Sequence, residues 1–200
     1  MSDLFDEKAE EWDSNDIVKI LSSAVGTSIL DNVSLRDNMY VMDFGAGTGL
    51  ISSQVAPHVK NILAVDISES MLKQLVSKPE LQGKVDMLCQ NIIDNPIDKK
   101  FDLIISAMAM HHVQDIDRLI QRFSQNLNSG ASIALADLDK EDGTFHPQDT
   151  DGIYHLGFQR DEFKDLLEKQ GFDNINFMTA HTVNKEEKEF PIFLVTATKN

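Results

Sequence analysis

The sequence predicts an α/β fold built on a mostly parallel sheet. Short apolar runs rich in Val, Ile and Leu alternate with segments whose apolar residues recur at helical spacing. A glycine-rich turn follows the first of these runs, and the last two runs lie too close together for a helix to fit between them. Alternation of strand and helix is typical of parallel sheets with right-handed crossovers, and the close final pair adds an antiparallel hairpin.

Five apolar runs predict strands that are buried on both faces of the sheet. In chain order they are Tyr40–Phe44, Asn61–Asp66, Lys84–Cys89, Phe101–Ser106 and Ala131–Asp137. Cys89, in the third run, is expected to be a small buried hydrophobic residue. Ser68 and Asp115 are expected to cap the N-termini of two intervening helices, and Gly171 to end the last one.

The two ends of the chain differ from this alternating middle. Residues 1–38 predict a helical cap made of two helices. In the first helix, one face is expected to hold Leu4, Phe5, Ala9 and Trp12. A second helix is suggested by Ile17, Ile20, Leu21 and Ile29. At the other end, Ile175–Thr179 and Pro191–Thr198 predict a hairpin at the sheet edge. We expect one domain over residues 1–200, with the cap followed by a core over 39–200.

The composition disfavours several classes of partner. Lys and Arg number 18 against 33 Asp and Glu, which gives a formal net charge of −15. Such a charge repels polyanions, so nucleic acid and anionic membrane surfaces are poor partners. The first residues carry neither the basic nor the apolar stretch of a secretory signal, and no apolar run is long enough to cross a bilayer. We therefore expect a cytoplasmic protein without membrane insertion.

The segment VMDFGAGTGL, residues 41–50, carries the clearest functional signal. It places a carboxylate near the strand end and then a run of small residues: Asp43, Gly45, Ala46, Gly47 and Gly49. Glycines permit positive φ and a close approach of the backbone to a ligand, and the helix that follows would offer free N–H groups. The third glycine comes one position too early for the dinucleotide fingerprint, and the P-loop lysine is missing. Alone, the loop is also compatible with a tight turn that binds nothing.

Two further strand ends carry polar side chains in the order that a nucleoside ligand requires. Asp66 ends the second strand, where a carboxylate in doubly wound folds accepts hydrogen bonds from ribose hydroxyls. Asn91 follows the third strand, and its amide has the donors and the acceptor needed to pair with an adenine edge. The joint pattern favours a nucleoside-containing cofactor over an empty turn.

With these residues in place, the sequence resembles the class I S-adenosylmethionine-dependent methyltransferases, specifically their small-molecule branch. The resemblance rests on VMDFGAGTG, AVDIS, QNIID ahead of Pro96, FDLIISAMAMHH, the terminal FLVTATK, and the N-terminal FDEKAEEWD. It implies a Rossmann-like, seven-stranded, mostly parallel sheet with helices on both faces and an antiparallel C-terminal hairpin. It also implies S-adenosyl-L-methionine as the cofactor.

The resemblance further implies which residues contact that cofactor. The glycine loop would hold the methionyl part together with the backbone near Ala107. The residues expected to contact the cofactor outside the loop are Asp66, Ile67, Asn91, Ile92, Ala107 and Trp12. The family often has aspartate where this chain has Asn91, and asparagine can still accept a hydrogen bond from the adenine amino group. Trp12 either covers the cofactor or only packs the N-terminal helix on the sheet.

Candidate residues for catalysis and for acceptor binding follow the fourth and fifth strands. The candidates for a general base are His111, His112 and His155. A His-His pair is frequent in the family, however, which favours a structural or cofactor-shaping role for His111 and His112 over that of a base. The irregular segment Asp137–Gln159, together with the N-terminal helix, is expected to select the acceptor, or else the segment is a mobile surface loop. Its candidate residues are Phe145, His146, Tyr154 and His155. Its acidic run does not match a calcium-binding loop, and we predict no metal site.

The expected function is methyl transfer from S-adenosylmethionine to a small-molecule acceptor. Amino-methylating nucleic-acid enzymes of this fold carry Asn/Asp-Pro-Pro-Tyr after the fourth strand, whereas this chain has Ser106-Ala107-Met108-Ala109. A nucleic-acid or protein methyltransferase, or a non-catalytic S-adenosylmethionine-binding protein, remains the alternative. The sequence specifies neither the acceptor, nor the acceptor atom, nor the oligomeric state.

Overall fold

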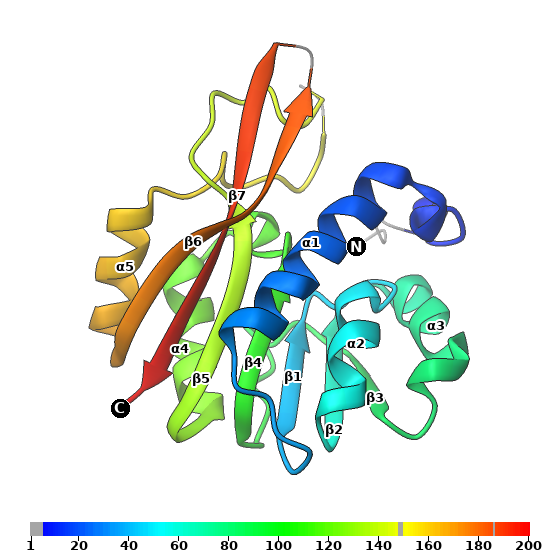
Figure 1. Ribbon diagram of the computed structural model, residues 1–200, viewed down its shortest axis with the longest axis vertical. Helices are drawn as coiled ribbons and strands as arrows, with labels where there is room; N and C mark the ends of the chain where they lie inside the picture. The colour runs from blue at the N-terminus through cyan, green and yellow to red at the C-terminus, as the bar shows by residue number, and fades with distance from the viewer. Residues whose placement is uncertain (1–5, 148–149, 186) are drawn as a thin grey trace.

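A single mixed sheet organises the molecule. The computed structural model describes residues 6–147, 150–185 and 187–200. Within these ranges, seven strands pair in the order β3-β2-β1-β4-β5-β7-β6 (Figure 1). They are β1 (Tyr40–Phe44), β2 (Asn61–Asp66), β3 (Val85–Cys89), β4 (Phe101–Ala107), β5 (Leu127–Leu138), β6 (Phe172–Lys185) and β7 (Lys188–Lys199). β1 to β5 pair in parallel, and β7 is antiparallel to both β5 and β6. The predicted mostly parallel sheet with an antiparallel C-terminal hairpin is confirmed.

Helices connect the parallel strands except between β3 and β4, where residues 90–100 form no helix. The α-helices are α1 (Asp16–Asn32), α2 (Leu50–Val55), α3 (Glu69–Ser77), α4 (Ile116–Asn126) and α5 (Arg160–Lys169). Short 3-10 turns are η1 (Asp6–Lys8), η2 (Trp12–Ser14), η3 (Ala56–His58), η4 (Pro79–Leu81) and η5 (Met110–His112). The predicted caps form: the Ser68 hydroxyl accepts the Met71 amide and the Asp115 carboxylate the Arg118 amide. Gly171, at φ +81°, follows the end of α5 as predicted.

Both faces of the sheet are covered, which confirms the predicted three-layer arrangement. Val25 of α1, Val55 of α2 and Leu72 of α3 are buried in one apolar cluster with residues of the sheet. Leu119 of α4 and Phe163 of α5 are buried in a second cluster. Figure 1 shows α1 and α2 on the near face and α4 on the far face. No helix within the described ranges is long and apolar enough to cross a membrane.

The N-terminal cap differs from the predicted pair of helices. Leu4 and Phe5 lie outside the described residues, and the segment after them forms the short turns η1 and η2. Asn15 ends this segment because its side chain accepts the amides of Ile17 and Val18 and so starts α1 afresh. On α1, Leu21 and Ile29 are buried, whereas Ile17 and Ile20 are 53% and 58% exposed. The predicted second helix is therefore confirmed, with Ile17 and Ile20 on its solvent-exposed side.

The third strand also departs from the expectation of burial on both faces. β3 lies at one edge of the sheet, and three of its five residues are exposed. Cys89 is among them, so its predicted burial is wrong. The apolar run alone did not distinguish this edge strand from the central ones, because the order of strands decides which of them lacks a second neighbour.

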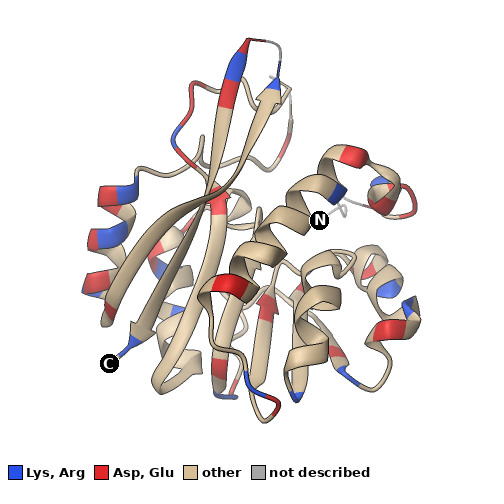
Figure 2. Ribbon diagram, viewed as in Figure 1, with Lys and Arg blue, Asp and Glu red and all other residues tan. Residues whose placement is uncertain are grey.

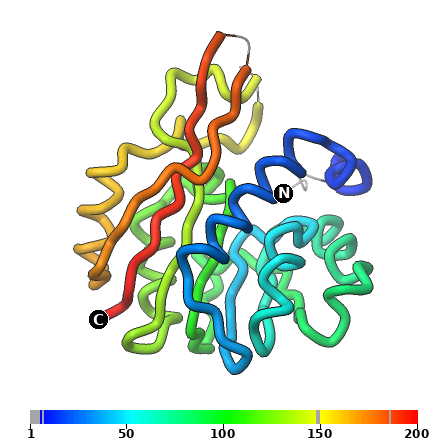
Figure 3. The backbone as a smooth tube through the Cα atoms, viewed as in Figure 1, coloured from blue at the N-terminus to red at the C-terminus, as the bar shows by residue number. Residues whose placement is uncertain are grey.

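The C-terminal hairpin is longer than predicted. β5 ends its pairing with β7 at Leu138 and Ile192, but β6 and β7 continue past that point as a two-stranded ribbon (residues 182–185 and 188–191). Figures 1 and 3 show this ribbon beside the loop of residues 139–158. The contact is direct, because Lys185 donates to the Phe145 carbonyl at 2.6 Å and the rings of Phe145 and Phe190 lie 5.3 Å apart.

Charged residues are spread over the whole fold. Figure 2 shows acidic segments at both ends of the sheet and on the outer helices, with basic segments interspersed among them on α5. The net charge of −15 is therefore not offset by one basic face in the part of the chain that the structure describes. This distribution offers little attraction to a polyanion.

Candidate functional site

The glycine loop lies between β1 and α2 at the carboxyl end of the parallel strands. Gly45, Gly47 and Gly49 have φ values of +66°, +53° and +83°. A Cβ on Gly45 would lie 2.2 Å from the Cβ of Ala109, and one on Gly49 would lie 2.6 Å from Leu75, so packing requires both glycines. A Cβ on Gly47 would meet no atom within 4 Å. Gly47 therefore has open space next to its Cα, and its backbone has a conformation that only glycine adopts readily.

Asp66 joins the ends of β1 and β2. Its Oδ2 accepts the amide of Gly47 at 2.8 Å, and its Oδ1 accepts the amide of Ser68 at 2.9 Å. The structure thus brings together the glycine loop and the predicted ribose-binding carboxylate. Ile67, directly after Asp66 at the carboxyl end of β2, is 66% exposed.

Asn91 and Ile92 follow β3 as predicted, but their side chains are engaged within the protein. The Asn91 Oδ1 accepts the Ile93 amide at 2.9 Å, and its Nδ2 donates to the Asp94 carboxylate at 2.9 Å. Ile92 is buried in the apolar cluster that also contains residues of α4 and α5. Adenine recognition here would use the backbone, or would need Asn91 to exchange these bonds; both assignments stay predictions.

Asp43 is enclosed rather than exposed to a ligand. It is 2% exposed, and the Ser52 hydroxyl of α2 donates to its Oδ2 at 2.6 Å. Burial raises the pKa of the Asp43 carboxyl to about 7, with a further increase from the nearby charge of Asp66 and an opposing effect of the Ser52 hydrogen bond. The side chain therefore supports the base of the glycine loop from inside.

The N-terminal cap contacts the glycine loop through a residue that sequence reasoning missed. The Thr48 hydroxyl donates to Asp13 Oδ1 at 2.5 Å, and the other Asp13 oxygen lies 2.6 Å from the Lys78 ammonium. Asp13 thereby connects η2 both to the loop and to the end of α3. Trp12, half-buried, lies next to this contact; whether it covers a cofactor stays open.

The end of β4 turns sharply toward the site. Ala107, half-buried, is followed by Met108, which has a positive φ of 56°. A left-handed conformation at a non-glycine residue costs about 1–3 kcal/mol and is found most often at functional sites. Sequence patterns gave no signal for this strain, because methionine has no preference for such a conformation. The Met108 amide donates to the Ala136 carbonyl at 2.9 Å, which fixes the turn against β5.

Three histidines gather just beyond this turn. The rings of His111 and His112 lie 4.2 Å apart, and the ring of His146 from the 139–158 loop lies 5.1 Å from His111. His111 is 1% exposed, and its Nδ1 lies 2.7 Å from the carboxylate of Asp137, at the end of β5. Asp137 was expected only as the start of an acidic loop, so its burial beside His111 was missed.

Burial affects the other two histidines of this cluster. It lowers the pKa of His112 to about 4, and the neighbouring His111 lowers it further, against the opposing hydrogen bond to the Gly152 carbonyl. The pKa of His146 is likewise lowered to about 4, first by burial and then by His111 and His112. Both imidazoles are therefore uncharged at neutral pH.

The 139–158 loop lies against the turn after β4. The amides of Tyr154 and His155 donate to the His111 carbonyl, and the His155 Nε2 lies 2.9 Å from the Val113 carbonyl. Phe145 is 7% exposed and packs below His146, whereas Tyr154 is 55% exposed. The structure therefore brings His146 to the predicted catalytic pair, while Tyr154 faces solvent. Across the described residues, no group of His, Cys, Asp and Glu is arranged to hold a metal ion.

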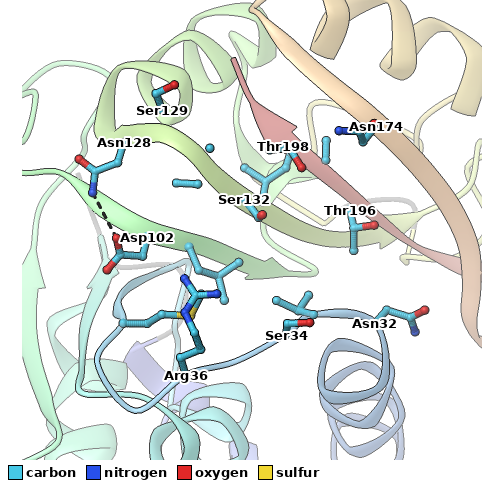
Figure 4. A pocket seen from close by; sticks show the side chains of 17 residues that line it. Asn32, Ser34, Arg36, Asp102, Asn128, Ser129, Ser132, Asn174, Thr196 and Thr198 are labelled. Atoms are coloured by element: carbon cyan, nitrogen blue, oxygen red, sulfur yellow. Dashed lines mark hydrogen bonds between the residues drawn. The ribbon is translucent and has the colours of Figure 1, made fainter.

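A hollow lies at the other end of the sheet, where the parallel strands β4 and β5 begin. Its volume is about 370 Å³, and its lining includes Arg36, Asp102, Asn128, Ser132 and Thr198 (Figure 4). Asn128 donates to Asp102 across it at 3.2 Å. Ligands of open α/β sheets bind outside the carboxyl ends of the strands, and this hollow opens at the starts of β4 and β5. The glycine loop and the histidine cluster, in contrast, lie at the carboxyl ends of the strands, and they form the candidate functional site.

Known proteins resemble this chain in sequence and in fold. A family model described as "Methyltransferase domain" matches residues 42–135, from β1 to β5. An uncharacterized methyltransferase of Schizosaccharomyces pombe is 25% identical over 185 residues, which cover 84% of this chain and 63% of that protein. The chain thus spans less than two thirds of that relative's length.

Solved structures show the same fold at low sequence identity. A Haloferax volcanii protein, solved in complex with the Trm112 methyltransferase activator, has a TM-score of 0.83 at 14% identity and covers 99% of this chain and 98% of its own. The N-methyltransferase NodS from Bradyrhizobium japonicum, in complex with S-adenosyl-L-homocysteine, has a TM-score of 0.74 at 14% identity, covering 98% and 94%. Motifs, the matched domain model, the relatives and the fold agree in what they resemble: this chain is similar to the class I S-adenosylmethionine-dependent methyltransferases.

Proposed function

We propose that this methyltransferase acts on a small molecule that binds between the glycine loop and the histidine cluster. The observation that carries the proposal is Asp66, whose carboxylate holds the loops after β1 and β2 together at the expected ribose position. S-adenosylmethionine supplies, when bound, an electrophilic methyl group on a sulfonium. The chain's own task is to hold that cofactor and to orient an acceptor opposite the departing sulfur.

The residues at the strand ends fit such a cofactor. The Asp66 carboxylate accepts the amides of Gly47 and Ser68 at the end of β2, where a carboxylate in doubly wound folds accepts hydrogen bonds from ribose hydroxyls. Gly47 has open space beside it, and the exposed Ile67 offers an apolar surface for a nucleoside ring.

A small acceptor is supported by the surroundings of the site. The charge of −15 disfavours nucleic acid, and the partly buried, uncharged imidazoles of His112 and His146 suit a compact organic molecule better than an extended polymer. The contact between Asp13 and Thr48 supports the view that cap and core work as one domain. A cytoplasmic location stays a prediction from composition.

The test combines binding and turnover. Calorimetric titration should show binding of S-adenosylmethionine and S-adenosylhomocysteine, with NAD binding more weakly or not at all. Release of S-adenosylhomocysteine should then be screened with small metabolites, a histone-like peptide and tRNA as alternative acceptors. Turnover with small metabolites supports the proposal. Turnover restricted to the peptide or to tRNA refutes the small-molecule assignment, and binding without turnover on any of these acceptors favours a non-catalytic role.

A further inference from the structure

Asp137 determines which nitrogen of His111 carries the proton. The carboxylate accepts the amides of Met110 and His111 on Oδ2 and that of Leu138 on Oδ1, all at 2.8–3.2 Å. Surrounded by donors, it acts as an acceptor toward His111 as well, so the His111 Nδ1–H donates to Oδ1 at 2.7 Å. In the neutral imidazole the other nitrogen, Nε2, then has a free lone pair.

That lone pair is buried and unused. Across the described residues, three buried side-chain atoms lack a hydrogen-bond partner, and two of them are the Nε2 atoms of His111 and His146. Buried polar atoms are nearly always paired, and an exception calls for a catalytic role or a missing partner. The centroids of the two rings lie 5.1 Å apart, so one small bound group can contact both imidazoles.

The chemistry of the two nitrogens favours a hydroxyl as the bridging group. A hydroxyl has one proton to donate to the His111 Nε2 and two lone pairs. One lone pair can accept a hydrogen bond from a neutral His146 Nε2–H, and the second remains free to attack a methyl group. An amine has a single lone pair, which the same arrangement would occupy. His146 also lines a hollow of about 140 Å³.

On the basis of the proposed function, we propose that the methyl acceptor is an alcohol or phenol whose hydroxyl binds between His111 and His146, with His111 as the catalytic base. The hydroxyl proton moves to the His111 Nε2 while the oxygen forms its bond to the methyl carbon. The carbon–sulfur bond breaks, and its electron pair stays on sulfur, which leaves as the neutral thioether of S-adenosylhomocysteine. Asp137 stabilises the imidazolium until its proton passes to solvent.

The first test reads the proton positions directly. Nitrogen-15 spectra of histidine-labelled protein with S-adenosylhomocysteine bound should show His111 protonated at Nδ1 and bare at Nε2 near neutral pH. Titration with a panel of phenol, catechol and ethanol should shift the His111 Nε2 resonance for at least one of them, while exposed His58 stays unchanged. A protonated Nε2, or a resonance that none of the hydroxyl compounds moves, overturns the proposal.

The second test is His111→Asn, because the asparagine amide can still donate to Asp137 but has no group at the Nε2 position. Transfer of labelled methyl from S-adenosylmethionine to the hydroxyl panel should fall at least 100-fold in kcat, in the range of a general base. His146→Ala should mainly raise the KM for the acceptor, and His58→Asn is the matched control. Aniline should not be methylated.

Failure of this inference differs from failure of the proposed function. Loss of S-adenosylhomocysteine binding in the unmodified protein refutes the function itself. Intact binding with label appearing on aniline alone, on none of the hydroxyl compounds, or at an unchanged rate in His111→Asn refutes only the assignment of His111 and of a hydroxyl acceptor. The proton positions in the unmodified protein decide the matter if His111→Asn does not fold.

Discussion

Asp43 makes the stability of the fold depend on pH in a way that one substitution can isolate. Burial raises the pKa of this carboxyl from 3.8 to about 7. Because the folded chain holds the proton more tightly than the unfolded chain, this contribution to stability is fully present below pH 3.8 and is lost as the pH rises through about 7. A shift of roughly 3 pH units corresponds to about 4 kcal/mol over the whole window.

Asp43→Asn should remove this dependence. The asparagine oxygen can still accept the Ser52 hydroxyl, but the side chain cannot ionise. Between about pH 5.5 and pH 8 the unmodified protein should therefore lose about 2 kcal/mol more unfolding free energy than the variant does. S-adenosylhomocysteine affinity should change little, since the side chain is enclosed beneath the loop.

The assay is guanidinium chloride unfolding of both proteins at the two pH values, with free energies from linear extrapolation. Asp86→Asn, at an exposed carboxylate on β3, is the control and should follow the unmodified protein. If Asp43→Asn shows the same loss of stability with pH as the unmodified protein, the Asp43 carboxyl is not the buried acid described above and the reasoning fails.

Three further outcomes are expected. Asp66→Ala should weaken S-adenosylhomocysteine binding in calorimetry by about 10- to 100-fold, since charge-assisted hydrogen bonds contribute roughly 1.5–3 kcal/mol each, while Asp86→Ala leaves it unchanged; equal affinities would remove Asp66 from the site. Gly47→Ala and Gly130→Ala both replace a glycine of positive φ that has open space around it, so each should cost about 1–2 kcal/mol in thermal or chemical unfolding, but only Gly47→Ala should impair cofactor binding. His112→Asn should lose less stability than the unmodified protein as the pH falls from 6.5 to about 4, because the lowered pKa of His112 makes its protonation oppose folding in that window; parallel acid-unfolding curves would contradict this.

Most of the fold could be predicted because it is encoded locally. β1 and β2 have the predicted bounds, and the caps at Ser68 and Asp115 depend on side chains next to the backbone that they satisfy. Cys89 shows where local patterns are insufficient. The sequence of β3 is apolar like those of the central strands, and only the order of strands in the sheet places β3 at an edge.

The site was predictable where backbone requirements restrict the residue type. The glycine loop and Asp66 are brought together as their order in the chain suggested. The contact of Asp13 with Thr48 and the burial of Asp137 beside His111 involve residues 35 and 26 positions apart, and their types are common on protein surfaces. Nothing in the spacing of such residues shows that they meet, because the tertiary fold alone brings them together.

The ribbon at the end of β6 and β7 has a consequence for how such enzymes diversify. Its residues extend past the pairing with β5, and Lys185 and Phe190 contact Phe145 beside the histidine cluster. The ribbon can therefore gain, lose or exchange residues without altering the register of the central strands that hold the glycine loop. Related chains should differ in length and composition at this ribbon when their acceptors differ, so that new substrates are acquired at one edge while the cofactor end of the sheet is inherited intact.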